Sequence, residues 1–207
     1  MQVVDPFPIL NTARLFLRQA HEGDVFVLLR TMQDAEVLRY YGMPRFETEQ
    51  DARDEIAWFE WLWAENQGIR WVITLAGSED YVGDIGFFRY KPEHARAEVG
   101  GKLIRACWGR SLMTEAMAAV VAYGLGEMGL NRIEALVDPR NRAMVRVLDK
   151  LGFAIEGTLR EYEIEHGVPV DLYMLSLLKR EWRGLSVEAV REPPGVNRTR
   201  PDIKEQG

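Results

Sequence analysis

The order of strand-like and helix-like segments is the feature that most restricts what this chain can fold into. Three strand-like segments follow one another at residues 70–75, 82–90 and 96–103, with turn-forming sequences between them. Consecutive strands joined by short turns favour an antiparallel meander. Beyond residue 103 helical periodicity covers 112–128 and 142–151, with a strand at 132–137 between these helices and two closing strands at 153–164 and 169–178. The sequence therefore predicts a mixed α/β fold of the α+β kind.

The N-terminal third predicts one strand and three helices. Residues 14–19 alternate polar and apolar side chains, which indicates a half-buried strand. Short helices are expected at 24–30 and 34–40, and a longer helix is expected to begin after Thr48 and to end near Gly68. That longer helix carries aromatic rings on more than one face, so the core cannot cover all of them. Core packing is one interpretation of these rings, and a substrate wall or a subunit contact is the other: Trp58, Phe59, Trp61 and Trp63.

The charge balance and the single cysteine exclude several classes of protein. The chain has 26 basic and 32 acidic residues, a net charge of −6, which argues against direct binding to nucleic acid and suits a cationic substrate better. Cys107 cannot form an intramolecular disulfide, and the N-terminus lacks the pattern of a signal peptide, so we expect a cytoplasmic protein. No apolar run reaches the length of a membrane span, and we expect neither a membrane partner nor a bound metal.

The composition changes after Trp182. Residues 183–207 contain three prolines and little apolar periodicity. Such a segment cannot bury enough apolar surface to hold a fixed fold. We therefore expect one domain at residues 1–182, followed by a tail at 183–207 that is mobile or draped over the surface.

Residues 103–116 run from the end of a strand through a short loop into a helix. The first N–H groups of a helix have no partner within it, and the positive end of the helix dipole lies at the same place. Together they form an anion site that suits a pyrophosphate. Gly109 permits a close approach of the backbone, and Arg110 can add a charge-assisted contact.

The same loop carries a resemblance to a known family. Residues 108–116 read Trp-Gly-Arg-Ser-Leu-Met-Thr-Glu-Ala, which resembles the Trp-Gly-Lys-Gly-Tyr-Ala-Thr-Glu-Ala pyrophosphate loop of the GNAT superfamily of N-acetyltransferases, in its ribosomal-protein N-terminal (alanine) acetyltransferase-like branch. Four further segments are similar to that branch in the same order: 12–18, 97–100, 130–135 and 141–153, the last continuing into 156–161. The resemblance extends from about Thr12 to Trp182, and five ordered segments are far more specific than one.

The resemblance implies an acyl-CoA N-acyltransferase fold, a mixed and mostly antiparallel sheet that is splayed at its central strand and flanked by helices. It implies acetyl-CoA as the cosubstrate, with the pantetheine arm pairing with the backbone of Leu103 and Ile104 and the pyrophosphate on N–H groups of the loop. Asn141 is expected to cap the following helix, and a contact from its amide to the cofactor is the alternative. The full set of cofactor residues implied is Leu103, Ile104, Trp108, Gly109, Arg110, Ser111, Leu112, Met113, Thr114 and Asn141.

The activity implied is the transfer of an acetyl group from acetyl-CoA to a primary amine. A protein N-terminal α-amine, as in the ribosomal-protein enzymes, is the leading acceptor. Two alternatives stay open: a catalytically silent module that binds CoA or a partner, and an N-acetyltransferase that acts on a small molecule such as a drug or a polyamine. Its partners would be acetyl-CoA and the amine acceptor, and a homodimer is also left open.

Two glutamates are candidates for the catalytic base. A free α-amino group has a pKa of about 8, so a carboxylate suffices as its base near neutral pH. Glu163 lies where the branch has a catalytic glutamate, and we prefer it as the base. Glu98 is expected on the splayed strand, as a relay or positioning group. For each of them a solvated or ion-paired strand glutamate is the alternative interpretation.

Four positions depart from the family pattern. Ser111 stands where the loop has a glycine, Met113 replaces an alanine, and Met144 and Leu148 replace the serine and the tyrosine that serve as acids in different branches. No side-chain acid is therefore expected at either place. If Ser111 needs a positive φ, the strain would cost roughly 1–2 kcal/mol unless its hydroxyl binds a phosphate.

Overall fold

The computed structural model describes residues 6–165 and 167–184. Within these ranges the strands are β1 (Leu10–Asn11), β2 (Leu15–Arg18), β3 (Ile69–Leu75), β4 (Tyr81–Lys91), β5 (Arg96–Leu103), β6 (Arg132–Val137), β7 (Ala154–Glu165) and β8 (Val168–Leu178). The helices are α1 (Val25–Thr31), α2 (Ala35–Leu38), α3 (Glu49–Ala64), α4 (Leu112–Gly126) and α5 (Arg142–Lys150). The strands form one sheet in the order β1-β2-β3-β4-β5-β6-β8-β7.

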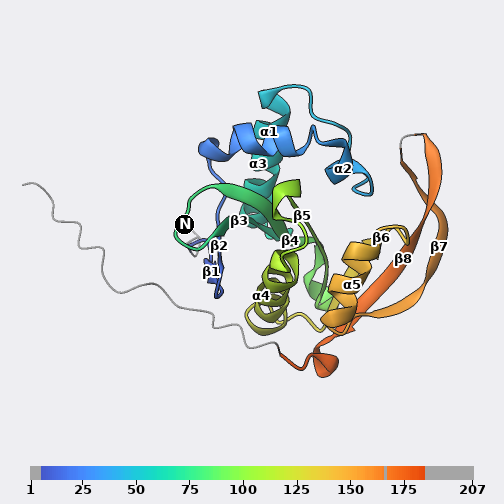
Figure 1. Ribbon diagram of the computed structural model, residues 1–207. Coiled ribbons are helices and arrows are strands. Elements are labelled where there is room, and N and C mark those ends of the chain that lie inside the picture. The colour runs from blue at the N-terminus through green and yellow to red at the C-terminus, as the bar shows by residue number, and fades with distance from the viewer. Residues whose placement is uncertain (1–5, 166, 185–207) are drawn as a thin grey trace, which may run out of the picture.

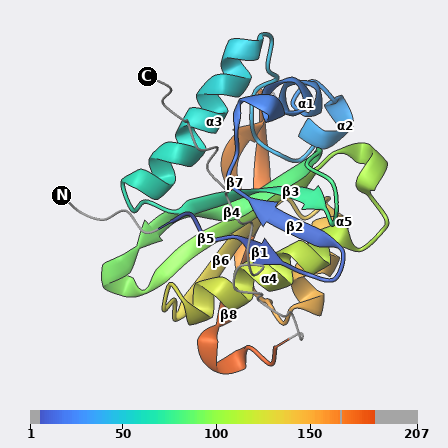
Figure 2. The ribbon, with the colours of Figure 1, turned by 90° about the vertical axis from the view of Figure 1, so that its left-hand side faces the viewer.

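Helices cover both faces of this sheet. Figure 2 shows α1 and α3 on one side of the strands and α4 on the other. The alternation along β3 explains both layers, since successive side chains of a strand point to opposite faces. Trp71 and Ile73 pack in the cluster that includes α4, whereas Val72 packs with Leu28 of α1 and Phe59 of α3. The core thus lies above and below the sheet.

The cap at Thr48 explains why α3 begins where it does. The Thr48 hydroxyl accepts a hydrogen bond from the Asp51 N–H at 3.4 Å, and the Asp51 carboxylate accepts one from the Thr48 N–H at 2.8 Å. This reciprocal pair satisfies N–H groups that the helix leaves free. The helix ends at Ala64, earlier than the predicted end near Gly68, because Asn66 has a φ of 52° and leaves the helical region.

The sheet is splayed at β5. Every pair of neighbouring strands in the described sheet is antiparallel except β5 and β6, which run parallel. Their pairing covers only residues 96–98 of β5 and 132–134 of β6. Beyond Glu98 the edge of β5 that faces β6 is open. In Figure 1 the β7–β8 hairpin rises on the far side of this opening from α1 and α2.

Most of the predicted architecture is confirmed. The mixed α/β class, the β3–β4–β5 meander and the splayed, mostly antiparallel sheet all agree with the sequence analysis. β1 was not predicted, because a two-residue strand shows no periodicity. The domain boundary at Trp182 stays a prediction, since residues 185–207 of the expected tail lie outside the described residues. None of the helices in the described ranges is both long and apolar enough to cross a membrane.

Candidate active site

A cavity of about 780 Å³ lies where β5 and β6 diverge. Residues 99–101 of β5 and 135–137 of β6 line it from the two sides of the splay. Residues 40–43, which follow α2, form another part of its wall. Trp58 and Trp61 of α3 also line the cavity, and Trp61 keeps 50% of its surface exposed. The rings that α3 cannot bury in the core therefore face this cavity.

Both glutamates predicted as catalytic line this cavity. Glu98 is held by an ion pair with Arg89 at 2.9 Å, and its side chain is only 12% exposed. Burial raises the pKa of Glu98 above its ordinary value, and the negative charges of Glu134 and Glu163 add to this effect, while Arg89 opposes it. The structure therefore brings Glu98 and Glu163 close enough for their charges to interact.

Glu163 differs from Glu98 in its partners. Its carboxylate is engaged in no ion pair or hydrogen bond with the residues that the structure describes. It lies against the segment that follows α2, since a Cβ added to Gly42 would be 3.4 Å from Glu163 Oε2. A carboxylate that lines a cavity and has no cation beside it is free to accept a proton from a bound amine.

The loop before α4 has the geometry of an anion site. Gly109 and Ser111 both adopt left-handed conformations, with φ of 72° and 59°. The first bond within the helix runs from the Glu115 N–H to the Ser111 carbonyl, so the N–H groups of residues 112–114 have no partner in a preceding turn. Gly109, Arg110 and Ser111 are exposed. A loop with exposed residues and free N–H groups at a helix N-terminus fits a pyrophosphate.

Strain at Ser111 was expected only if its φ is positive, and its φ is 59°. The Ser111 hydroxyl makes no capping hydrogen bond to the helix. A non-glycine residue in this region is strained by roughly 1–2 kcal/mol. The hydroxyl is therefore available to a phosphate oxygen, and this contact stays a prediction.

The end of β5 shows which backbone groups face the opening. The Ile104 N–H donates to the Val82 carbonyl at 2.9 Å, and the Ile104 carbonyl accepts from the Cys107 N–H at 3.0 Å. Because hydrogen-bonded pairs alternate in an antiparallel ladder, the backbone groups of Val99, Gly101 and Leu103 point away from β4 and toward the opening. The sequence analysis missed Val99 and Gly101, which the alternation from a known pairing register would have found.

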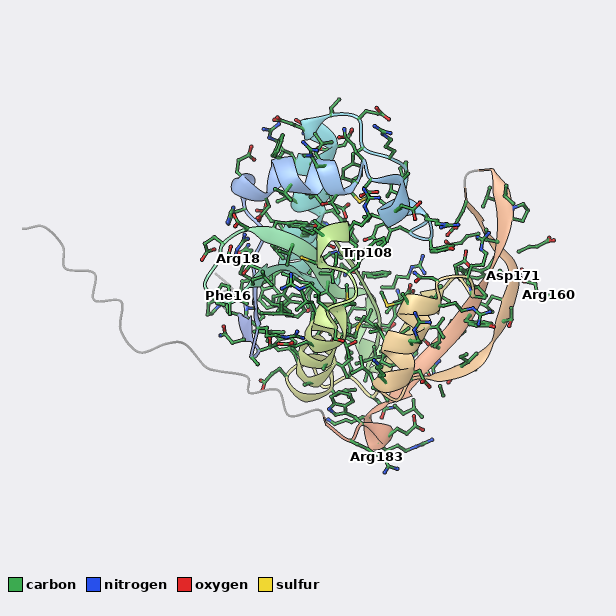
Figure 3. The ribbon with its side chains drawn as sticks, in the orientation of Figure 1. Phe16, Arg18, Trp108, Arg160, Asp171 and Arg183 are labelled. Carbon is green, nitrogen blue, oxygen red and sulfur yellow. The ribbon has the colours of Figure 1, made fainter. Side chains whose placement is uncertain are left out.

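Leu103 and Trp108 are linked at the same edge. The indole Nε1 of Trp108 donates to the Leu103 carbonyl at 2.9 Å, and the ring remains 44% exposed. Figure 3 shows Trp108 where the chain approaches α4. The Leu103 N–H is therefore the group of that residue left for a ligand that lies along β5.

Asn141 caps the N-terminus of α5, as predicted. Its side-chain oxygen accepts a hydrogen bond from the Met144 N–H at 3.1 Å, and the residue also lines the cavity. The amide nitrogen can still donate. Met144 and Leu148 line the same cavity. They occupy the positions where GNAT branches have a serine or a tyrosine as the general acid, and neither side chain can donate a proton.

A buried ionic cluster lies in the β3–β5 half of the sheet, beside the cavity. Asp84 binds Arg70 Nε and Lys102 Nζ, each at 2.8 Å, and accepts a hydrogen bond from Tyr81. Burial alone would raise the pKa of Asp84, but Lys102 and Arg70 hold it below its ordinary value. The Tyr41 hydroxyl accepts hydrogen bonds from Arg70 Nη2 at 2.9 Å and from Lys102 Nζ at 3.2 Å. Sequence reasoning missed this cluster.

The cavity carries more acidic than basic side chains. Arg70 and Arg89 are its only cations among the described residues, and each is paired with a carboxylate. The acidic residues that line it are Glu55, Glu98, Asp138, Glu163 and Glu165. An acidic cavity suits a positively charged acceptor. Among the described residues, no group of three His, Cys, Asp or Glu side chains is placed to hold a metal ion.

Comparison with known proteins adds to this geometry. The family model described as "Acetyltransferase (GNAT) domain" matches residues 14–154. An N-acetyltransferase of Bacillus subtilis (strain 168), YoaA, is 39% identical over 173 residues, which cover 84% of this chain and 98% of YoaA.

Two solved structures share the fold. One is RimL, a ribosomal L7/L12 α-N-protein acetyltransferase in complex with coenzyme A, with a TM-score of 0.76 and 18% identity over 82% of this chain and 97% of RimL. The other is spermidine N-acetyltransferase from Vibrio cholerae in complex with CoA and spermine, with a TM-score of 0.72 and 20% identity over 81% of this chain and 96% of that enzyme.

Proposed function

The chain belongs to the GNAT acetyltransferase family and is an acetyl-CoA-dependent N-acetyltransferase, and from this premise we propose that its acceptor is a protein N-terminal α-amine, acetylated by direct transfer. The observation that carries the proposal is the convergence of Glu163, with no cation beside it, and the open edge of β5 on one cavity. The first offers a base and the second offers a backbone edge along which an acyl donor can lie.

This chain holds the donor at three places. The N–H groups of residues 109–114 and the positive end of α4 bind the pyrophosphate. The open edge of β5, at Val99, Gly101 and Leu103, pairs with the amide groups of the pantetheine arm as an added strand would. The Asn141 amide donates a further hydrogen bond. Bound acetyl-CoA supplies the activated acetyl group.

Glu163 then accepts the proton that the attacking amine gives up. Its position on β7, against the segment after α2, lets it reach an amine that enters the cavity. Glu98, paired with Arg89, orients the amine or a bridging water. Because Met144 and Leu148 carry no acidic proton, the sulfur leaves as a thiolate or takes its proton from water.

The hairpin suits a polypeptide acceptor. Tyr162, Ile164 and Val168 expose 49%, 66% and 59% of their surface near the end of the hairpin. These side chains do not line the cavity; they form an apolar surface at the end of the hairpin that provides contacts for acceptor residues outside the cavity.

A polyamine is the second candidate, favoured by the acidic lining of the cavity. The spermidine enzyme that shares this fold binds spermine. A polyamine carries several positive charges, and five carboxylates line the cavity. Four of them are paired with Lys102, Arg140 or Arg89, and Glu163 is the one with no ion pair among the described residues.

Thiol release from acetyl-CoA tests both candidates. A panel would contain short peptides with free N-termini, the same peptides with blocked N-termini, spermidine, and peptides whose only amine is a lysine side chain. We expect release with the free peptides alone, and mass spectrometry should place the acetyl group on the α-amine. Release with spermidine alone would establish the second candidate. Binding of CoA without turnover on any acceptor would favour a silent module.

A further inference from the structure

Arg14, in the turn between β1 and β2, reaches across to the loop before α4. Its Nη1 donates to the Arg110 carbonyl at 3.0 Å, and its Nε donates to Glu115 Oε2 at 2.6 Å. The Arg14 N–H and the Thr12 hydroxyl bind the other oxygen of Glu115, at 2.9 and 2.6 Å. Residues about a hundred positions apart are thereby joined at the candidate pyrophosphate loop.

The contact at the Arg110 carbonyl fixes the direction of the next N–H group. A trans peptide unit is planar, with its C=O and N–H pointing in opposite directions. When Arg14 holds the Arg110 carbonyl on its own side, the Ser111 N–H of the same peptide unit points to the other side. The positive φ of Ser111 makes this peptide orientation costly without such a partner.

The contact at Glu115 controls charge. Glu115 lies in the first turn of α4, close to the N–H groups that would bind an anion. Burial acts to raise its pKa, but hydrogen bonds from Thr12 and Arg14 hold the pKa of Glu115 below its ordinary value. The carboxylate is therefore ionised at neutral pH, and without Arg14 it would repel a diphosphate.

We propose that Arg14 is a positioning residue for acetyl-CoA: it orients the Arg110–Ser111 peptide toward the pyrophosphate and cancels the charge of Glu115. The proposal rests on the proposed role of the 109–114 loop. It gives the Arg14 side chain an effect on cosubstrate affinity, although 49% of that side chain is exposed and it lies outside the residues that line the cavity.

Three variants test the proposal by calorimetry with acetyl-CoA and by steady-state kinetics. Arg14→Met should raise the Kd and KM for acetyl-CoA about tenfold, with kcat at saturation within about threefold of the unmodified protein. Arg14→Met combined with Glu115→Gln should recover part of this affinity, because the repelling charge is gone. Arg53→Met is the matched control, since Arg53 of α3 is likewise a partly exposed arginine held by carboxylates, in its case those of Glu22 and Glu49. It should leave the Kd unchanged.

Acetyl-pantetheine separates positioning of the diphosphate from a general structural effect. It has the thioester and the pantetheine arm but no diphosphate, so its kcat/KM should stay within about twofold in Arg14→Met. An equal loss with both donors would overturn the proposal. An unchanged acetyl-CoA Kd in Arg14→Met would also overturn it. If the double variant bound acetyl-CoA no more tightly than Arg14→Met, the proposed role of Arg14 in cancelling the charge of Glu115 would be wrong. If the unmodified protein bound no acetyl-CoA, the proposed function itself would fail.

Discussion

The two sides of the splayed sheet differ in how their charged side chains are buried and paired. In the β3–β5 half, Arg70, Asp84 and Lys102 are 3%, 0% and 4% exposed and are bound to one another. In the β7–β8 hairpin most side chains of β7 are exposed, and Glu163 has no ion partner in the described part of the chain. Figure 3 shows Arg160 and Asp171 on this hairpin, across the molecule from Phe16 and Arg18 of β2.

This difference in charge pairing corresponds to two roles, one in positioning β5 and one in meeting the acceptor. A buried and mutually satisfied cluster fixes the position of β5, which carries the open edge for the acyl donor. An exposed strand with an unpaired carboxylate can meet an acceptor, and changes there cost little stability. We therefore expect substitutions in the first region to affect folding and those in the second to affect catalysis.

Glu163→Gln should give the largest effect on catalysis. The substitution keeps the shape and removes the basicity, so kcat should fall roughly 10²–10⁴-fold. The melting temperature should change by less than about 2 °C, since Glu163 contributes no ion pair. The defect should shrink as the pH rises toward 9, because the amine then loses its proton to water.

Glu98→Gln is the matched variant on the other side of the splay. We expect a smaller rate loss, because a water molecule can replace a positioning group. If Glu98→Gln were the inactive variant and Glu163→Gln nearly normal, the two roles would have to be exchanged. Normal rates in both would mean that the enzyme only orients an already neutral amine.

Asp84→Asn should give the largest effect on stability. It leaves Arg70 buried without its carboxylate and Lys102 with Glu55 alone, 3.7 Å away. Removing one partner of a buried ion pair typically costs 3–5 kcal/mol. For a chain of this size the melting temperature should fall by roughly 10 °C, as calorimetry or thermal denaturation would measure. Asp171→Asn on the hairpin is the control and should change it by less than about 2 °C. Equal effects at the two sites would contradict the contrast between the two regions.

The sequence predicted the elements of both regions but not their charge pairs. Periodicity located β3–β8 and the helices, and the loop at 108–114 was identified from its residues and its resemblance. The cluster around Asp84 could not be predicted, because Asp84 meets Lys102 only through the register of β4 with β5. The contact between Arg14 and Glu115 spans 101 positions, and no local pattern indicates it.

Ser111→Gly tests the strain in the donor loop. Glycine adopts a φ of 59° without the cost that serine has there. If strain dominates, acetyl-CoA affinity should stay the same or improve by up to about tenfold, measured by calorimetry. A loss greater than about tenfold would show that the hydroxyl binds a phosphate strongly enough to outweigh the strain.

The smallest expected effect is on the stability of the fold at low pH, through Glu156. Hydrogen bonds from Arg132 and then Ser176 lower the pKa of Glu156 from its ordinary value to about 2. A depressed carboxyl pKa stabilises the fold above the ordinary pKa, and this contribution is lost as the pH falls from about 4.5 toward 2. Because the Glu156 side chain is 42% exposed, solvent screening limits the effect to less than about 1 kcal/mol. Glu156→Gln should therefore lower the melting temperature slightly at pH 7 and leave it unchanged near pH 2.

Calorimetric titration of acetyl-CoA into the unmodified protein, Gly109→Pro and Glu163→Gln tests the central claim most directly. Proline removes an N–H donor and fixes φ near −65°, whereas Gly109 needs a φ of 72°, so binding should be lost or greatly weakened. Glu163→Gln should bind acetyl-CoA like the unmodified protein, because its carboxylate serves the acceptor. An unchanged affinity in a folded Gly109→Pro protein, or an equal loss of affinity in Glu163→Gln, would contradict the assignment of donor and acceptor to the two sides of the splay.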